Sequence, residues 1–208
     1  MNEPVLWYFA DPMCSWCWGF SPIIEALREE YRPRLKIALV LGGLRPGETA
    51  PMTSPGREEI LHHWHQVHVR TGQAFKFDGA MPAGFVYDTE PPSRAVVAAG
   101  SLAPDSVFSI FKAIQSAFYA EGRDVTQRDT LASLTAELGL DRAAFLQAFD
   151  SDEAHTRIRA HFKQARQVGV RGFPTLILQQ GENLHRIANG WQPLDGIREK
   201  LETRLPGA

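Results

Sequence analysis

The sequence predicts an α/β fold that carries a large all-helical insertion, and three observations lead to this prediction. A strand, helix, strand pattern occupies the first 41 residues. Strand-like runs then stop until after residue 174, and helical periods of apolar residues fill the stretch between. With 208 residues, 44% of them hydrophobic, the chain is long enough to bury one substantial core. The two strand-bearing ends are therefore expected to form one domain.

The first strand, helix, strand unit covers residues 5–41. Residues 5–9 are short, apolar and rich in aromatic side chains, which is typical of a strand buried on both faces of a sheet. Residues 15–31 carry apolar side chains and then charges in a pattern that predicts a helix with one buried side, and residues 36–41 supply a second strand. This order predicts a parallel pair joined by a right-handed crossover. The segment after the first strand then lies at the carboxyl edge of the sheet, where open α/β sheets bind ligands.

Five helices are predicted in the insertion, each from apolar residues at helical spacing. In chain order the marking residues are Ile60, Trp64 and Val67; Val107, Phe111, Ile114 and Phe118; Leu131, Leu134 and Leu138; Phe145 and Phe149; and Ile158, Phe162 and Ala165. Thr126 with Asp129 is a candidate cap for the third helix and Asp141 for the fourth. Residues 73–92 contain glycines and prolines without a period, which predicts a long loop that either borders the functional site or is a plain surface excursion.

Sheet-like sequence returns at residues 175–178 and 184–188, which predict two strands joined by a turn at residues 181–183. A final helix follows, marked by Leu194, Ile197 and Leu201. These elements divide the chain into a first half of the sheet-bearing domain, a helical insertion and a second half, at residues 1–50, 51–167 and 168–208.

Charge and hydropathy narrow the classes of partner. The 22 basic and 24 acidic side chains give a net charge of -2, which provides no electrostatic footprint for nucleic acid or for an anionic membrane surface. The first residues lack the basic segment and apolar run of a secretory signal, and no stretch approaches the roughly 18 to 20 apolar residues of a membrane span. We therefore expect a cytoplasmic protein that acts on small molecules or other proteins.

The chain's two cysteines, Cys14 and Cys17, follow the first strand and open the first helix. Backbone N–H groups and the positive dipole end at a helix N-terminus stabilise a thiolate at Cys14. Three residues of helix bring Cys17 round to the same side, so the two sulfurs can open and close a disulfide. In a reducing cytosol such a pair is seldom a permanent crosslink, which favours a catalytic or a metal-binding role.

Half of a structural zinc site is the competing interpretation of the cysteine pair. A closed site needs four ligands, and the other two would come from His62, His65 and His68, which recur at a spacing of three residues. No carboxylate or thiol lies at ligand spacing near these histidines. The favoured interpretation is therefore a solvated polar helix face that flanks a buried Trp64, with no metal site.

A second motif carries a family resemblance. Residues 169–175 read Gly-Val-Arg-Gly-Phe-Pro-Thr, and together with the Cys-x-x-Cys motif in the expected order they resemble the DsbA-like thiol-disulfide oxidoreductases. Residues 11–17 are particularly similar to a FrnE-type, cytosolic branch described as predicted protein-disulfide isomerases. The resemblance implies a thioredoxin-like fold with a helical insertion, and a cis bond between Phe173 and Pro174 opposite the cysteines. The chain differs from better-studied members in its Ser15-Trp16 pair and in its bulky Phe173.

The expected function is thiol-disulfide exchange, in which Cys14 attacks and Cys17 resolves the mixed disulfide. Trp16, between the cysteines, and the turn at Phe173 and Pro174 are the expected substrate-binding residues, whereas Trp18 and Phe20 are expected in the core. Substrates would be cysteine-containing proteins or small thiols. The cysteine pair itself is the redox group, so no separate cofactor is expected, and glutathione is a candidate reductant.

Two other classes remain open. A glutathione-dependent transferase or isomerase of the kappa type shares the helical-insert architecture but uses a serine at the position of Cys14. A non-catalytic metal-binding or chaperone module would hold zinc with the cysteines and some histidines and would bind clients on its aromatic side chains. The presence of Cys14 disfavours the first class, and the lack of a carboxylate or thiol at ligand spacing near the histidines disfavours the metal site of the second.

Overall fold

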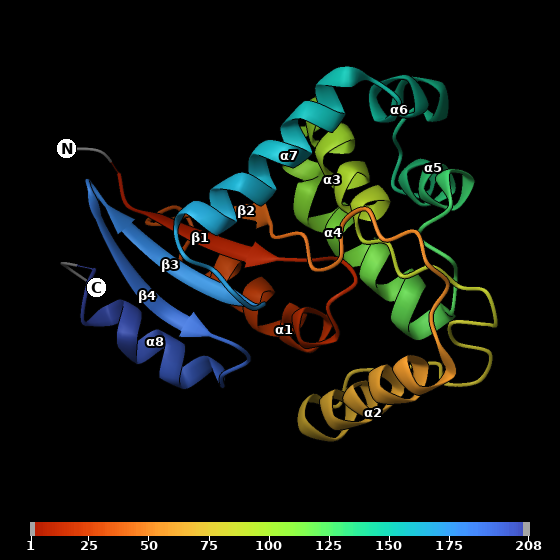
Figure 1. Cartoon of the computed structure of the whole chain (residues 1–208). Coiled ribbons are helices and arrows are strands. Elements are labelled where there is room, and N and C mark those ends of the chain that lie inside the picture. The colour runs from red at the N-terminus through yellow and green to blue at the C-terminus, as the bar shows by residue number, and fades with distance from the viewer. Residues whose placement is uncertain (1–2, 206–208) are drawn as a thin grey trace.

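A computed structural model describes residues 3–205 and shows a four-stranded sheet joined to a group of helices (Figure 1). The elements in chain order are β1 (Val5–Ala10), α1 (Ser15–Glu30), β2 (Lys36–Leu41), α2 (Ser54–Thr71), α3 (Glu90–Leu102), the 3-10 turn η1 (Pro104–Ser106), α4 (Val107–Ser116), the π-helical turn η2 (Ala117–Glu121), α5 (Arg128–Glu137), α6 (Arg142–Phe149), α7 (Asp152–Gln167), β3 (Thr175–Gln180), β4 (Asn183–Asn189) and α8 (Leu194–Glu202).

The strand order in the sheet is β2-β1-β3-β4. β1 and β2 are parallel, with Leu6 opposite Ile37, which confirms the predicted crossover unit. β3 is antiparallel to both of its neighbours, β1 and β4, as expected for a hairpin at the end of the chain. The sequence therefore places the end of β1, and the cysteines after it, in the middle of the sheet edge.

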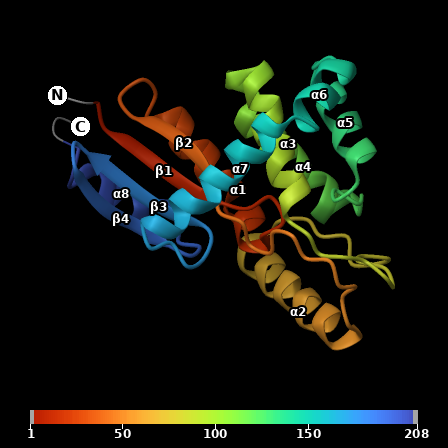
Figure 2. The same cartoon turned by 45° about the horizontal axis from the view of Figure 1, so that its top comes forward.

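Helices cover both faces of the sheet. α7 lies across one face, and α1 and α8 lie on the other (Figures 1 and 2). Because strand side chains alternate between faces, Phe9, Val40 and Ile177 pack with Ala165 of α7, whereas Leu6 and its neighbours join the larger core on the opposite face. The larger core, on the face that includes Leu6, is continuous with the interior of the helical group. The sheet and the helical group therefore share one apolar interior.

The α3 helix was not predicted, and the expected loop at residues 73–92 is too long by its last three residues. α3 lies among α4, α6 and α7 and is buried on most sides. Many of its buried residues are small, including Ala95, Ala98 and Ala99. A helix that is apolar nearly all round has no one-sided period for sequence analysis to detect. The prolines in its first turn, Pro91 and Pro92, are a helix-start signal that the analysis missed.

The predicted helix caps had mixed outcomes. Asp141 caps α6, where its carboxylate accepts the N–H of Ala144 at 2.7 Å. The predicted cap at Thr126 is wrong, because α5 begins after Gln127 and the Thr126 hydroxyl donates to the nearby Asp124 carboxylate at 2.6 Å. A side chain two residues away competes successfully for this hydroxyl group.

α2 is fixed to α1 by a close approach at Gly19. A Cβ atom at this position would lie 2.7 Å from Val67 and 2.9 Å from Thr71, both on α2. Only a glycine therefore allows this packing distance.

Over residues 3–205, none of the helices is both long enough and apolar enough to cross a membrane.

Candidate redox site

Cys14 and Cys17 lie at the carboxyl end of β1, where α1 begins. Cys14 is the N-cap residue of α1, and its backbone carbonyl accepts the N–H groups of Cys17 at 2.9 Å and Trp18 at 3.1 Å. Both cysteines are free thiols. Cys14 is 7% exposed and Cys17 is completely buried, which confirms that Cys14 is the more accessible of the two.

The Cys14 thiol points across the site toward the second motif. It donates to the Phe173 carbonyl oxygen over 3.6 Å. Its sulfur makes no capping hydrogen bond with the first turn of α1, which differs from the expected contact with the helix N–H groups. In the thiol form the side chain is a donor and the facing carbonyl is an acceptor, so this contact is favoured over one between two donors.

The Phe173-Pro174 peptide bond is cis and faces Cys14, as predicted. Pro174 is buried, and its carbonyl accepts the N–H of Gly190 at 2.8 Å. The half-buried Phe173 ring covers Gly42 at the end of β2 so closely that any Cβ at this glycine would overlap it. The missing side chain of Gly42, directly after β2, therefore leaves the space that the Phe173 ring occupies.

The aromatic residues near the cysteines divide into two groups. Trp18 and Phe20 are buried in the core, as predicted. Trp16 is only half-buried and packs against the core with part of its surface, so its exposed part remains available at the turn between the cysteines.

Asp11 is a site residue that the sequence analysis missed. It is completely buried, and its two carboxylate oxygens accept the N–H groups of Met13 at 2.9 Å and Leu44 at 2.7 Å. Burial raises the pKa of Asp11 to about 6, although these two hydrogen bonds act in the opposite direction. Asp11 belongs to the segment of residues 11–17 that carries the family resemblance and precedes a proline, as is common in turns, but neither signal indicates that its carboxylate is buried.

The surroundings of Cys17 disfavour its thiolate. Burial raises the pKa of Cys17 strongly, and a hydrogen bond with Cys14, the charge of Cys14 and the charge of Asp11 raise it further. Tyr8 on β1 lies below the pair, and its pKa is also raised, first by burial and then by the charges of Cys17 and Cys14. The interior of the site thus keeps Cys17 protonated, while Cys14 lies closer to the surface.

The predicted loop after α2 borders the site. Of the two alternatives left open by the sequence, a loop at the site and a plain surface excursion, the first is therefore correct. The Tyr87 hydroxyl donates to the Met13 carbonyl at 2.6 Å, next to Cys14. At the start of the loop, the Gln73 amide donates to the Trp18 carbonyl at 3.0 Å. The helical insertion therefore holds the turn that carries both cysteines.

Trp191 is a third residue near the site that was not predicted, after Asp11 and Tyr87. It follows Gly190 in the loop between β4 and α8, and its indole N–H donates to the Gly19 carbonyl at 3.2 Å. The Arg70 guanidinium group of α2 lies 4.9 Å from the centre of the Trp191 ring. A single tryptophan in a short connection has no period or motif that could indicate this position.

The histidines of α2 lie where the favoured interpretation placed them. His62, His65 and His68 are exposed, and Trp64 between them is buried. Within residues 3–205, no group of three histidine, cysteine, aspartate or glutamate side chains is arranged to hold a metal ion.

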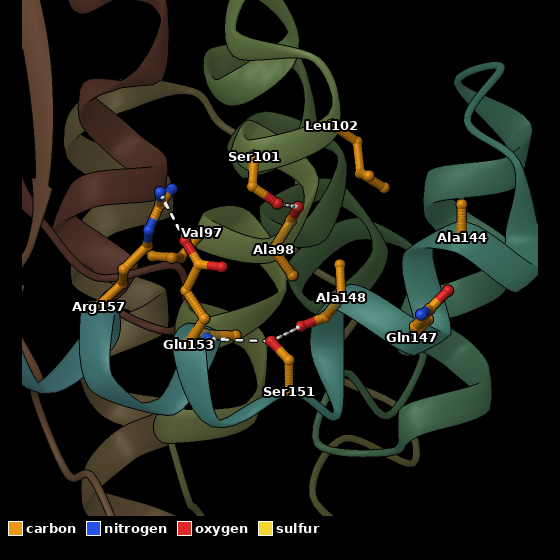
Figure 3. A pocket seen from close by; sticks show the side chains of 11 residues that line it. Val97, Ala98, Ser101, Leu102, Ala144, Gln147, Ala148, Ser151, Glu153 and Arg157 are labelled. Carbon is orange, nitrogen blue, oxygen red and sulfur yellow. Dashed lines mark hydrogen bonds and ion pairs between the residues drawn. The ribbon is translucent and has the colours of Figure 1, made fainter.

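A cavity of about 270 Å³ lies among α3, α6 and α7, and none of the candidate site residues lines it (Figure 3). Arg157 and Glu153 form an ion pair at 2.7 Å beside this cavity, and the Ser151 hydroxyl donates to the Ala148 carbonyl at 2.6 Å. The cavity is therefore separate from the cysteine pair.

A thioredoxin-type sheet with a helical insertion, a Cys-x-x-Cys pair at the start of α1 and a facing cis-proline turn define a class of thiol-disulfide oxidoreductases. The chain belongs to the family described as the DSBA-like thioredoxin domain, whose model matches residues 5–202. The sequence resemblance and the expected fold class are thereby confirmed.

Solved structures and curated proteins resemble this chain to different extents. A candidate protein disulfide isomerase from Nitrosomonas europaea is 45% identical, with a TM-score of 0.92 over 97% of each chain. The cytosolic disulfide reductase DsbM from Pseudomonas aeruginosa is 33% identical, with a TM-score of 0.81 over 98% of this chain and all of the other, and has also been solved with glutathione. The ClpXP adapter protein SpxH from Halalkalibacterium halodurans is 26% identical over 83% of this chain. This chain spans only 57% of the length of that adapter.

Proposed function

We propose that this protein reduces or isomerises disulfides by exchange through Cys14 and Cys17. The observation that carries the proposal is the position of the two sulfurs. Cys14 is partly accessible and faces the Phe173 carbonyl, whereas Cys17 is buried one turn further along α1. The Cys14 sulfur can therefore contact a substrate, while the Cys17 sulfur lies buried behind it.

The exchange proceeds in two balanced steps. The Cys14 thiolate attacks one sulfur of a substrate disulfide, forms a mixed disulfide and releases the first substrate thiolate. Cys17 then loses its proton and attacks the Cys14 sulfur, which releases the second substrate thiolate. Two electrons pass from the cysteine pair to the substrate, and the two cysteine protons end on the released thiols. The reverse sequence oxidises a substrate dithiol.

The reducing direction is supported by the 33% identity to a cytosolic disulfide reductase. In this direction glutathione would restore the dithiol. One glutathione thiolate attacks the oxidised pair, and a second attacks the resulting mixed disulfide and leaves as glutathione disulfide. Backbone groups of Phe173 beside Pro174 would pair with an extended substrate segment, which gives affinity without strict sequence selection.

An insulin-reduction assay with glutathione as reductant tests the proposal, with Cys14→Ser as the matched control. We expect turnover by the wild-type protein and a loss of at least about 100-fold in the variant, because the attacking sulfur is gone. Turnover by Cys14→Ser close to wild type would overturn the proposal. Wild-type protein that is folded by circular dichroism but inactive would overturn it as well.

The similarity to ClpXP adapter proteins supports a second proposal, in which the chain binds another protein without chemistry. A double variant, Cys14→Ser with Cys17→Ser, separates the two proposals. An adapter would keep its affinity for a captured partner in this variant, whereas an exchange enzyme would lose its disulfide-linked complexes.

A further inference from the structure

An exposed arginine and a tryptophan meet beside the Pro174 turn. Arg70 belongs to the last turn of α2, and Trp191 lies in the connection between β4 and α8. The guanidinium carbon lies 4.9 Å from the centre of the indole ring, which is within the range of a cation–π contact. The pair joins the helical insertion to the second half of the sheet.

Two hydrogen bonds connect Trp191 and its neighbour Gly190 to segments next to the redox site. The N–H of its neighbour Gly190 donates to the Pro174 carbonyl at 2.8 Å, and the indole N–H donates to the Gly19 carbonyl at 3.2 Å. Pro174 is next to Phe173, whose carbonyl accepts the Cys14 thiol. Trp191 is therefore attached both to the turn that faces Cys14 and to the helix that begins after it.

The connection that carries Trp191 is itself held in place. The Lys200 ammonium group donates to the Gln192 side chain at 2.8 Å and to the Ile187 carbonyl at 3.2 Å. Asp195, the acidic residue that follows in α8, pairs with Arg198 at 2.9 Å. Asp195, the acidic residue nearest in sequence to Trp191, is thus paired with Arg198 and not with Arg70.

Arg70 is exposed, and among residues 3–205 no carboxylate lies within ion-pair distance of it. By contrast, Arg198 and Arg128 pair with Glu30 and Asp150. A guanidinium group that stacks on an aromatic ring keeps its edge donors available, and these donors match the two oxygens of a carboxylate. The close packing of α2 on Gly19 limits how far Arg70 can move.

We propose that Arg70, held on Trp191, binds a carboxylate of an anionic thiol or disulfide whose sulfur reacts with Cys14. This inference rests on the proposed exchange function and adds the substrate class to it. Removing the Arg70 charge should then slow the reaction with an anionic disulfide and leave the reaction with a neutral disulfide unchanged. Arg70 acts on substrate choice and takes no part in the transfer of electrons between sulfurs.

Three small disulfides that differ in charge test this selectivity: glutathione disulfide, which is anionic, hydroxyethyl disulfide, which is neutral, and cystamine, which is cationic. The measurement is the rate constant for oxidation of the fully reduced protein by each disulfide. Arg70→Glu reverses the charge and Arg70→Lys keeps it without the planar group. Arg159→Glu, an exposed position on α7, is the matched control.

We expect Arg70→Glu to slow the reaction with glutathione disulfide by about fivefold, the upper range for one exposed ion pair, and to leave the neutral disulfide unchanged. The reaction with cystamine should become faster, and Arg70→Lys should fall between the wild type and Arg70→Glu. Arg159→Glu should change none of the three rate constants. The selectivity should also shrink as salt is added, because the interaction is with an exposed charge.

Different failures of this experiment have different meanings. Equal slowing of all three disulfides by Arg70→Glu would overturn the inference and leave Arg70 with a structural role, and an equal effect of Arg159→Glu would reduce it to a general effect of net charge. Both outcomes leave the proposed function intact. A reduced wild-type protein that none of the disulfides oxidises would overturn the proposed function together with the inference.

Discussion

The sheet half of the molecule, formed by β1 to β4 with α1 and α8, and the helical insert, formed by α2 to α7, contribute different things to the site. The sheet half supplies both sulfurs and the facing turn at Pro174. The insert supplies no sulfur, but it holds the cysteine turn through Tyr87 and carries Arg70, which lies over the Trp191 ring. The sheet half thus contains the reacting groups, and the insert holds the turn that carries them.

The largest expected effect tests the sheet half alone. Cys17→Ala should leave the attack by Cys14 intact but remove the resolving thiol, so mixed disulfides with glutathione or client proteins should accumulate to nearly one per protein. Non-reducing electrophoresis and intact mass spectrometry measure the adduct. Cys14→Ser is the control and should form none. Equal adduct from both variants would show that the two sulfurs do not have separate roles.

The next effect concerns Asp11, which links the cysteine turn to the loop after β2. Its pKa is raised from 3.8 to about 6 in the folded protein, so the folded state binds more protons than the unfolded state between these values. Stability from this group is therefore present below about pH 4 and is lost as the pH rises through 6. The loss should amount to about 3 kcal/mol, at 1.36 kcal/mol for each pKa unit.

Urea unfolding of the wild type and of Asp11→Asn between pH 4 and pH 7 measures this loss. The asparagine does not titrate, so the free energy of unfolding of the wild type should fall relative to the variant as the pH rises. Asp105→Asn, at an exposed position of the insert, is the control and should show no such trend. A difference between wild type and Asp11→Asn that is constant with pH would contradict the burial argument.

The smallest expected effect tests whether the insert influences disulfide exchange. Tyr87→Phe removes a 2.6 Å hydrogen bond to the Met13 carbonyl, and Tyr31→Phe removes a 2.7 Å bond to Glu202 far from the cysteines. Each variant should lose about 1 to 2 kcal/mol of stability. Only Tyr87→Phe should also slow disulfide exchange, by a few-fold, because the cysteine turn loses its support. Unchanged exchange in Tyr87→Phe would mean that the insert does not influence the chemistry.

The two regions also differ in how far sequence predicts them. In the sheet half, each strand and helix leaves a local pattern, and the motif around Pro174 indicates which segment faces the cysteines. In the insert, helices with one exposed side, such as α7, were predicted from their period, whereas α3 was not because its small residues are buried on most sides. Burial in the centre of a helical group removes the polar side on which the period depends.

The same holds for the residues of the site: those that belong to a local sequence pattern were predicted, and the others were not. Cys14, Cys17 and Pro174 were found because they belong to motifs that are continuous in sequence. Asp11, Tyr87 and Trp191 were missed because their roles depend on contacts between distant segments, such as the bond from Tyr87 to the Met13 carbonyl, 74 positions away. A single sequence contains no record of such contacts.

The fit between Phe173 and Gly42 restricts how this site can change. The ring fills the space that a side chain at residue 42 would need, so the two positions share one fixed volume. A larger residue at position 42 requires the Phe173 ring either to move away or to be replaced by a smaller side chain. Substitutions at these two positions are therefore coupled, and any side chain at position 42, directly after β2, comes with a new position or a new size for the residue before Pro174.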